Sequence, residues 1–258
     1  MINIAITEDD INFIKQYKNM ISRYMQSHGP ECRIDDYSSP EDILAGSMNY
    51  DLFCLDIEIL DKESAMSYSV KRLTEGEMLD IYTGPAKHHF PEAELKPLYA
   101  VKKLMENGEY IGLGMFDDNA GLMAYALFTV SKDTDIILLD YYAVLEEYRS
   151  QGTGSIFLSE MKNVLKGVGG ILLETEDIEF AVNEDEADIR RRRDSFYRRN
   201  GVSATGVKSG YCGVNYNIWY LPVDREIDTK TARSALESLY NTMFEYMKDS
   251  DKVDRFIV

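Results

Sequence analysis

Two glycines separated by one residue stand where a buried strand is followed by a helix. Gly152 and Gly154 come after the apolar run of residues 136–144, IILLDYYAV, and before apolar residues that recur at helical spacing up to Leu165. A helix start presents unpaired N–H groups and the positive end of the helix dipole, and glycine lets a bulky anion approach the backbone. The pattern predicts a pyrophosphate site, although many tight turns use glycine and bind nothing.

Cysteine and histidine, which also carry much protein chemistry, are sparse in this chain. There are three residues of each type, and the cysteines lie far apart in the sequence. A disulfide framework needs paired cysteines, and a zinc site needs closely spaced Cys or His ligands. His88 and His89 are adjacent, but no further ligand stands at a suitable spacing. We therefore predict neither a metal site nor a disulfide.

The glycine loop has a more specific pattern than the pair alone. Arg149-x-x-Gly152-x-Gly154 follows a strand that ends Tyr142-Ala143-Val144. This resembles the acetyl-CoA loop of the GNAT superfamily of N-acetyltransferases, Gln/Arg-x-x-Gly-x-Gly/Ala between a strand and a helix. A Walker lysine and a GxGxxG pattern are absent, so other nucleotide sites fit less well. The resemblance implies that acetyl-CoA is the cosubstrate and that it is bound by Tyr142, Ala143, Val144, Arg149, Ser150, Gln151, Gly152, Thr153, Gly154 and Ser155.

A second resemblance to this superfamily lies in the basic helix predicted over residues 187–200, ADIRRRRDSFYRRN. Phe196-Tyr197-x-x-x-Gly201 matches the signature in which a tyrosine lies beside the sulfur of CoA and acts as a general acid. The asparagine that usually stands seven residues before the tyrosine is Arg190 here, so its contact is not carried over. The resemblance assigns Tyr197 as the proton donor, and the alternative is an aromatic residue that packs on the sheet.

The two resemblances imply acetyl transfer to the primary amine of a small molecule or peptide. The amine must be neutral to attack, and because a free alkylammonium has a pKa of about 10, a carboxylate or a water relay must take its proton. Asp140, the only charge in the central strand, and Glu174, in the next predicted strand, are the two candidates. Candidate substrate contacts, which a solvated helix face would explain equally well, are His89, Glu92 and Glu94.

The elements that would position this site follow in order from residue 66. A strand over residues 68–73 precedes a capping box, Thr74-x-x-Glu77, which opens the first of two helices. Two hairpin strands then lead to the central strand, the glycine loop and its helix. The order β-α-α-β-β-β-loop-α is that of the GNAT superfamily. We therefore expect an α/β (α+β) fold with a GNAT-like mixed central sheet flanked by helices, over residues 66–224.

The first segment, residues 1–61, has the pattern of a truncated β-α-β-α-β unit. It resembles the front half of a response-regulator receiver domain, in which an acid pair after the first strand holds Mg²⁺ and the aspartate that ends the third strand accepts phosphate. Glu8, Asp9 and Asp56 hold those positions. The Ser/Thr and Lys that complete such a switch are absent. We expect a structural remnant or an interaction module rather than a phosphorylation switch.

The tail, residues 225–258, lies outside the superfamily core. Residues 232–247 form an amphipathic helix whose apolar face either covers that core or contacts a second copy in a homodimer. The formal net charge of −17 argues against nucleic acid as a partner. No apolar run approaches the length of a membrane span, and no signal-peptide pattern is present. We therefore expect no membrane contact and a cytoplasmic location.

The sequence thus predicts an acetyl-CoA-dependent N-acetyltransferase of GNAT type. A different class stays open, in which the chain is a non-catalytic sensor or scaffold. Such a protein would bind acetyl-CoA without turnover and would contact partners through the receiver-like segment. Tyr197 favours the enzyme, because a binding module needs no proton donor.

Overall fold

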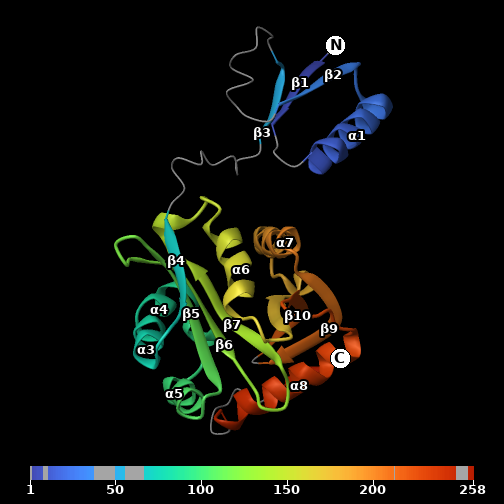
Figure 1. Ribbon diagram of the computed structural model, residues 1–258. Helices are drawn as coiled ribbons and strands as arrows, with labels where there is room; N and C mark the ends of the chain where they lie inside the picture. Colours follow the sequence, from blue (N-terminus) through green and yellow to red (C-terminus); the bar gives the residue numbers. More distant parts are fainter. Residues whose placement is uncertain (1, 8–10, 38–49, 56–66, 212, 248–254) are drawn as a thin grey trace. The chain divides into compact units, whose positions relative to one another are not determined.

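The computed structural model describes residues 2–7, 11–37, 50–55, 67–211, 213–247 and 255–258 (Figure 1). The chain divides into two compact units, Met1–Met66 and Ser67–Val258. Glu8, Asp9 and Asp56, which hold the receiver-like positions, lie outside the described residues. The second helix predicted for the first unit also lies outside them.

In the first unit, the described residues form three parallel strands and one long helix. The described elements are β1 (Ile2–Thr7), α1 (Ile11–His28), β2 (Cys32–Tyr37) and β3 (Leu52–Leu55). The strand order is β2-β1-β3, so β1 lies in the middle, and its residues Ile4, Ala5 and Ile6 are buried. Alternation of apolar strands with an amphipathic helix predicts this parallel arrangement. The receiver-like nature of the segment stays a prediction.

In the second unit, the described residues form a sheet of eight strands in the order β11-β9-β10-β8-β7-β6-β5-β4 (Figure 1). Neighbouring strands are antiparallel except β7 and β8, which are parallel. β7 has the bounds predicted from its apolar run, whereas β11 was not predicted. The strands are β4 (Tyr68–Arg72), β5 (Tyr110–Asp117), β6 (Leu122–Thr129), β7 (Ile136–Val144), β8 (Gly170–Glu176), β9 (Ser203–Tyr211), β10 (Val214–Pro222) and β11 (Arg255–Ile257).

Helices connect these strands, and their starts follow from the sequence. The predicted capping box is confirmed, because the Glu77 N–H donates to Thr74 Oγ1 and the Thr74 N–H donates to Glu77 Oε2. α7 begins earlier than predicted, because Asn183 caps it by accepting from the Glu186 N–H. The helices are α3 (Glu75–Thr83), α4 (Pro85–His89), η1 (Glu92–Glu94), α5 (Leu98–Glu106), η2 (Glu146–Tyr148), α6 (Thr153–Val164), η3 (Ile178–Phe180), α7 (Glu184–Arg199) and α8 (Thr229–Glu245).

Helices cover both faces of the sheet. α6 and α7 pack on one face, where Phe157 and Tyr197 join a cluster with Leu139 of β7. α3, α4 and α5 pack on part of the other face, and α8 covers the rest of it, with Leu236 and Leu239 fully buried (Figure 1). The apolar face of α8 is therefore used within the unit itself. None of the described helices is long and apolar enough to cross a membrane.

Candidate active site

The parallel strands β7 and β8 pair over only the first part of their length. The paired residues run from Ile136 with Gly170 to Leu139 with Leu173. β7 continues beyond these pairs to Val144, and β8 continues to Glu176. Beyond these pairs the backbone of β7 has no ladder partner in β8 among the described residues. The N–H and C=O groups on that side of β7 can therefore bond an extended ligand.

A bulge in β7 lies at the point where the pairing with β8 ends. On the other side of the strand, Leu127 of β6 pairs with Tyr141 and Phe128 pairs with Leu139, so Asp140 is the extra residue. A bulge bends its strand and increases the local twist, which accounts for the separation of β7 from β8. The sequence did not reveal the bulge, because the residues around Asp140 form one continuous apolar run.

The loop before α6 uses its two glycines for different reasons. Gly152 is the N-cap of α6 and has φ +76°, in the left-handed region that glycine favours. Gly154 is needed for space, because a Cβ there would lie 3.2 Å from the ring of Phe196 and 3.5 Å from the hydroxyl oxygen of Tyr142. Ser150 has φ +59° and adds a second left-handed residue to the same turn.

The start of α6 presents free N–H groups. The Ile156 N–H makes the first bond of the helix, to Gly152 O at 3.1 Å, and no described residue accepts from the N–H groups of Thr153, Gly154 or Ser155. These donors and the helix dipole suit a phosphate group. The side chain of Arg149 donates through Nε to Val144 O at 2.9 Å and so closes the end of β7.

Two tyrosines lie on this side of the sheet. The Tyr142 hydroxyl donates to Gly154 O at 2.6 Å and so fixes the loop to β7. Tyr197 is only 8% exposed, and burial raises its pKa to about 12, so its hydroxyl is protonated at neutral pH. No described residue accepts a hydrogen bond from it. Tyr197 is therefore a proton or hydrogen-bond donor that the protein itself does not use.

The two candidate bases occupy equivalent positions, since Asp140 and Glu174 are the first residues beyond the last β7–β8 pair. Asp140 is buried in an ion pair with Lys96 Nζ at 2.8 Å, and it accepts from Thr129 Oγ1 at 2.9 Å. The side chains of the ion pair are 1% and 8% exposed. Loss of the Asp140 side chain would leave the Lys96 ammonium buried without its partner, which is costly.

Within the described part of the chain, no cation forms an ion pair with Glu174. The hydroxyl of Tyr240 donates to its Oε1, and the hydroxyl of Tyr211 donates to its Oε2 at 3.2 Å. Burial raises the pKa of Glu174 to about 7, although the tyrosines and the charge of Lys96 oppose the rise. A carboxylate with this pKa suits proton abstraction near neutral pH. Sequence reasoning missed Tyr211 and Tyr240, which resemble ordinary core aromatics in the sequence.

The three residues predicted to contact the substrate differ in whether their side chains are exposed or already bonded within the chain. The Nδ1 atom of His89 is hydrogen-bonded to the hydroxyl of Tyr125 at 2.9 Å, and the two rings stack. Glu92 and Glu94 are exposed. The Tyr141 hydroxyl donates to Glu94 O at 3.1 Å and so ties η1 to β7. Of the three, the two glutamates have side chains that can reach a ligand.

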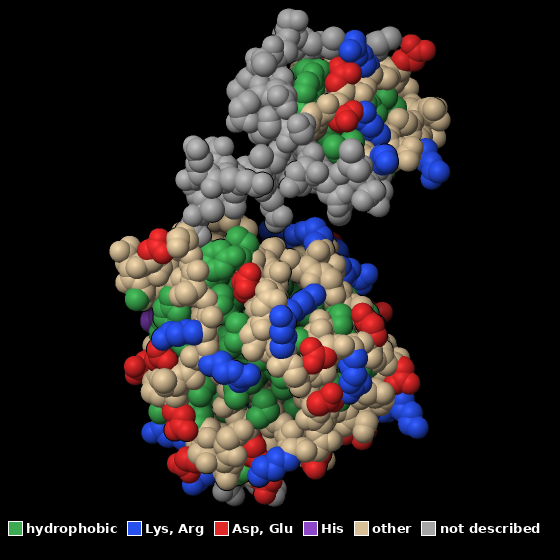
Figure 2. Space-filling view, viewed as in Figure 1, with side chains coloured by type: hydrophobic (Ala, Val, Ile, Leu, Met, Phe, Trp, Pro, Cys, Tyr) green, Lys and Arg blue, Asp and Glu red, His purple; other side chains and the backbone are tan. Residues whose placement is uncertain are grey.

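The arginines of α7 are largely paired within the chain. Arg190, at the position of the superfamily's asparagine, bonds Glu186 and the carbonyl oxygen of Asp177. Arg191 pairs with Asp188 at 2.7 Å, and Arg193 pairs with a carboxylate of β8. Figure 2 likewise shows acidic and basic side chains intermixed over the visible face of the second unit. The basic run thus belongs to an ion-paired helix face.

Comparison with known proteins found similarity in structure alone. No family model matches the sequence, and no curated protein matches it. A solved structure described as a GNAT-family acetyltransferase from Bacteroides thetaiotaomicron superposes with a TM-score of 0.54 at 17% identity, over 67% of this chain and 96% of that one. The mixed sheet flanked by helices therefore has the GNAT fold, and the predicted fold class is confirmed.

Two further structures illustrate the range of similar proteins. The ribosomal-protein-S18-alanine N-acetyltransferase of Escherichia coli gives a TM-score of 0.44 at 20% identity, over 62% of this chain and 97% of that one. The spermidine N-acetyltransferase of Vibrio cholerae, solved with CoA and spermine, gives 0.45 at 9% identity, over 60% of this chain and 95% of that one.

Proposed function

We propose that the second unit is an acetyl-CoA-dependent N-acetyltransferase that acts on the primary amine of a small molecule or peptide. The observation that carries this proposal is the unpaired stretch of β7 beside the free N–H groups at the start of α6. An extended thioester with a pyrophosphate needs both features at once. The GNAT fold of the unit supports the same reaction class.

The residues predicted to hold acetyl-CoA suit that role. The N–H groups of Thr153, Gly154 and Ser155 bind the pyrophosphate, and the missing Cβ of Gly154 lets the loop lie against Phe196 and Tyr142. Bound acetyl-CoA supplies an acetyl group activated as a thioester. The backbone of residues 142–144 pairs with its extended arm, and a β7 N–H donates to the carbonyl oxygen where negative charge develops.

The proton steps fall to Glu174 and Tyr197, on opposite faces of the sheet. Glu174 takes the proton from the attacking amine, because its pKa of about 7 leaves it largely ionised at slightly alkaline pH. Tyr197 donates a hydrogen bond to the sulfur, where negative charge develops as the carbon–sulfur bond breaks. Asp140 is paired with Lys96 and serves the site by holding the bulge in place.

Binding and turnover can be tested separately. Gly154→Val places a side chain against Phe196 and Tyr142, so calorimetry should show acetyl-CoA affinity reduced at least tenfold. Gly152→Ala imposes a left-handed alanine on the loop, at a cost of about 1–2 kcal/mol. Gly108→Ala is its matched control, because Gly108 also has positive φ and open space around it but lies between α5 and β5.

Unchanged affinity in Gly154→Val would show that the loop does not bind acetyl-CoA. Turnover is measured as thiol release from acetyl-CoA with a panel of amines, amino-acid conjugates and peptides. Release that depends on one amine supports the enzyme. Tight binding without release for any acceptor would instead favour a non-catalytic acetyl-CoA-binding protein.

A further inference from the structure

The helix that follows the GNAT-like core contacts the proposed base directly. Tyr240 of α8 is fully buried, and its hydroxyl donates to Glu174 Oε1. The same hydroxyl lies 2.8 Å from the hydroxyl of Ser209 in β9. A helix that only covered the sheet would need apolar side chains at this position. Tyr240 instead adds a hydroxyl that donates to the carboxylate of Glu174, at the point where β7 and β8 separate.

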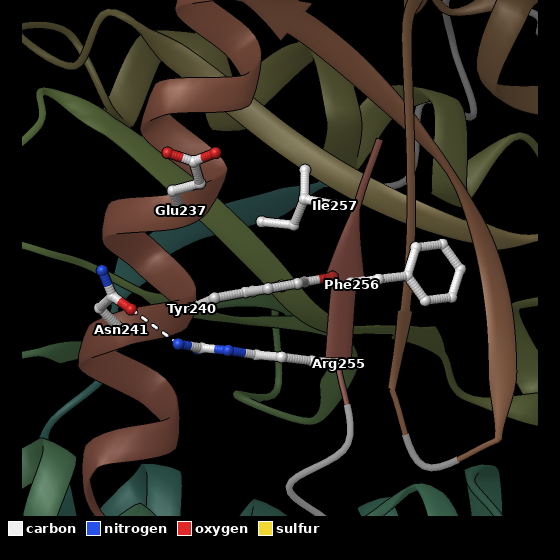
Figure 3. A pocket seen from close by; sticks show the side chains of 6 residues that line it. All are labelled: Glu237, Tyr240, Asn241, Arg255, Phe256 and Ile257. Atoms are coloured by element: carbon white, nitrogen blue, oxygen red, sulfur yellow. Dashed lines mark hydrogen bonds between the residues drawn. The ribbon is translucent and has the colours of Figure 1, made fainter.

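β11 contacts both β9 and α8, the two elements that carry Tyr211 and Tyr240. β11 pairs with β9 from Tyr211 to Ser209, the stretch that flanks the carboxylate of Glu174. Arg255 of β11 donates to Asn241 Oδ1 of α8 at 2.8 Å, which links the strand to the helix (Figure 3). A pocket of about 330 Å³ lies between the two elements, and Tyr240, which extends from α8 toward β11, forms part of its wall (Figure 3).

The carboxylate of Glu174 is acted on by groups from five parts of the fold. Lys96, from the segment before α5, is already paired with Asp140, and no direct contact between Lys96 and Glu174 is present among the described residues. The hydroxyls of Tyr240 and Tyr211 donate to the carboxylate, and Ser209 Oγ makes a longer hydrogen bond of 3.5 Å to its Oε1. The titratable and charged groups that interact with the Glu174 carboxylate are Lys96, Asp140 of β7, Tyr211 of β9, Tyr216 of β10 and Tyr240 of α8.

We infer that Tyr240 is a positioning residue that orients Glu174 for proton transfer, so that the C-terminal helix is part of the active site. The inference rests on the proposed function. Its physical basis is the pair of tyrosine hydrogen bonds, which restrict rotation of the carboxylate and favour its ionised form. Tyr211 acts in the same way through its longer bond to Oε2.

The test replaces the hydroxyl and follows Glu174 itself. Tyr240→Phe keeps the ring and removes a hydrogen bond to the ionised form, so the pKa of Glu174 should rise by roughly one unit or more. Carbon-13 NMR of glutamate-labelled protein measures this titration without any turnover, and Glu174→Gln identifies the signal. Tyr246→Phe is the matched control, because Tyr246 is the C-cap residue of α8 and its hydroxyl donates to Glu109 at 2.8 Å.

The rate profile is the second measurement. In Tyr240→Phe the acid limb of kcat/KM should move to higher pH by the same amount as the carboxyl signal, and Tyr246→Phe should leave both in place. If Tyr240→Phe does not fold, Tyr211→Phe should give a smaller shift in the same direction. A Glu174 titration that neither variant moves overturns the inference, whatever the turnover. A moved titration in a protein that acetylates no amine overturns the proposed function instead.

Discussion

Replacement of Tyr197 by phenylalanine tests the group assigned to the leaving sulfur with little effect on the fold. The ring stays in the cluster beside α6, and no described residue loses a hydrogen bond, so the free energy of unfolding should change by less than about 1 kcal/mol. Acetyl-CoA affinity should change little, because the hydroxyl is assigned to the leaving sulfur. A loss of kcat in this variant therefore reports on chemistry.

The magnitude follows from the pKa of about 12 that burial gives Tyr197. An ordinary thiol has a pKa of about 8.5, so complete proton transfer from Tyr197 to a thiolate is uphill by about 5 kcal/mol. Tyr197 therefore acts through a hydrogen bond to the developing thiolate. A bond to a charged group contributes about 1.5–3 kcal/mol, which corresponds to a fall in kcat of roughly 10- to 150-fold.

The assay is thiol release with the best acceptor, under conditions where the chemical step limits kcat, together with calorimetry of acetyl-CoA. A variant that keeps more than half of the parental kcat would show that Tyr197 is a packing residue. Equal losses in affinity and kcat would also contradict the argument, because they would indicate a disturbed binding site.

Two further predictions concern the other carboxylates. Asp140→Ala leaves the Lys96 ammonium buried without its partner and should lower the free energy of unfolding by about 3–5 kcal/mol in urea titrations. Asp135→Ala is the control, because it breaks an exposed ion pair with Arg225 and should lower the free energy of unfolding by less than about 1 kcal/mol. Similar losses in both variants would refute the argument from the buried ion pair. Asp56 should take up no stoichiometric phosphate from acetyl phosphate and Mg²⁺ by intact mass, and an adduct that Asp56→Asn abolishes would establish a working phosphoacceptor.

Local sequence signals predicted the central part of the fold well. The apolar run from Ile136 to Val144 became β7 with the same bounds, and the glycine pattern placed the start of α6. Both features depend on residues close together in the chain. The structure adds the reason why residue 154 is glycine, because a side chain there would lie against Phe196 of α7.

Long-range contacts were beyond the reach of the sequence. The position of Tyr240 beside Glu174 joins residues 66 apart in the chain, and a helical pattern shows only that Tyr240 is on the apolar face. β11 is three residues long, too short for a strand pattern to stand out. The sequence could likewise not choose between Asp140 and Glu174, because the choice depends on where Lys96 lies.

The buried lysine explains why two similar carboxylates have different roles. Asp140 and Glu174 lie at matching positions on β7 and β8, and among the described residues Lys96 forms an ion pair with Asp140 and not with Glu174. Its charge still acts on Glu174, but the charge of Asp140 opposes it there, and burial then raises the pKa of Glu174 to about 7. The raised pKa of Glu174 thus comes mainly from its burial, together with the nearby charge of Asp140. In the proposed mechanism the Asp140–Lys96 ion pair therefore fixes the bulged strand, and Glu174, with its raised pKa, takes the proton of the amine.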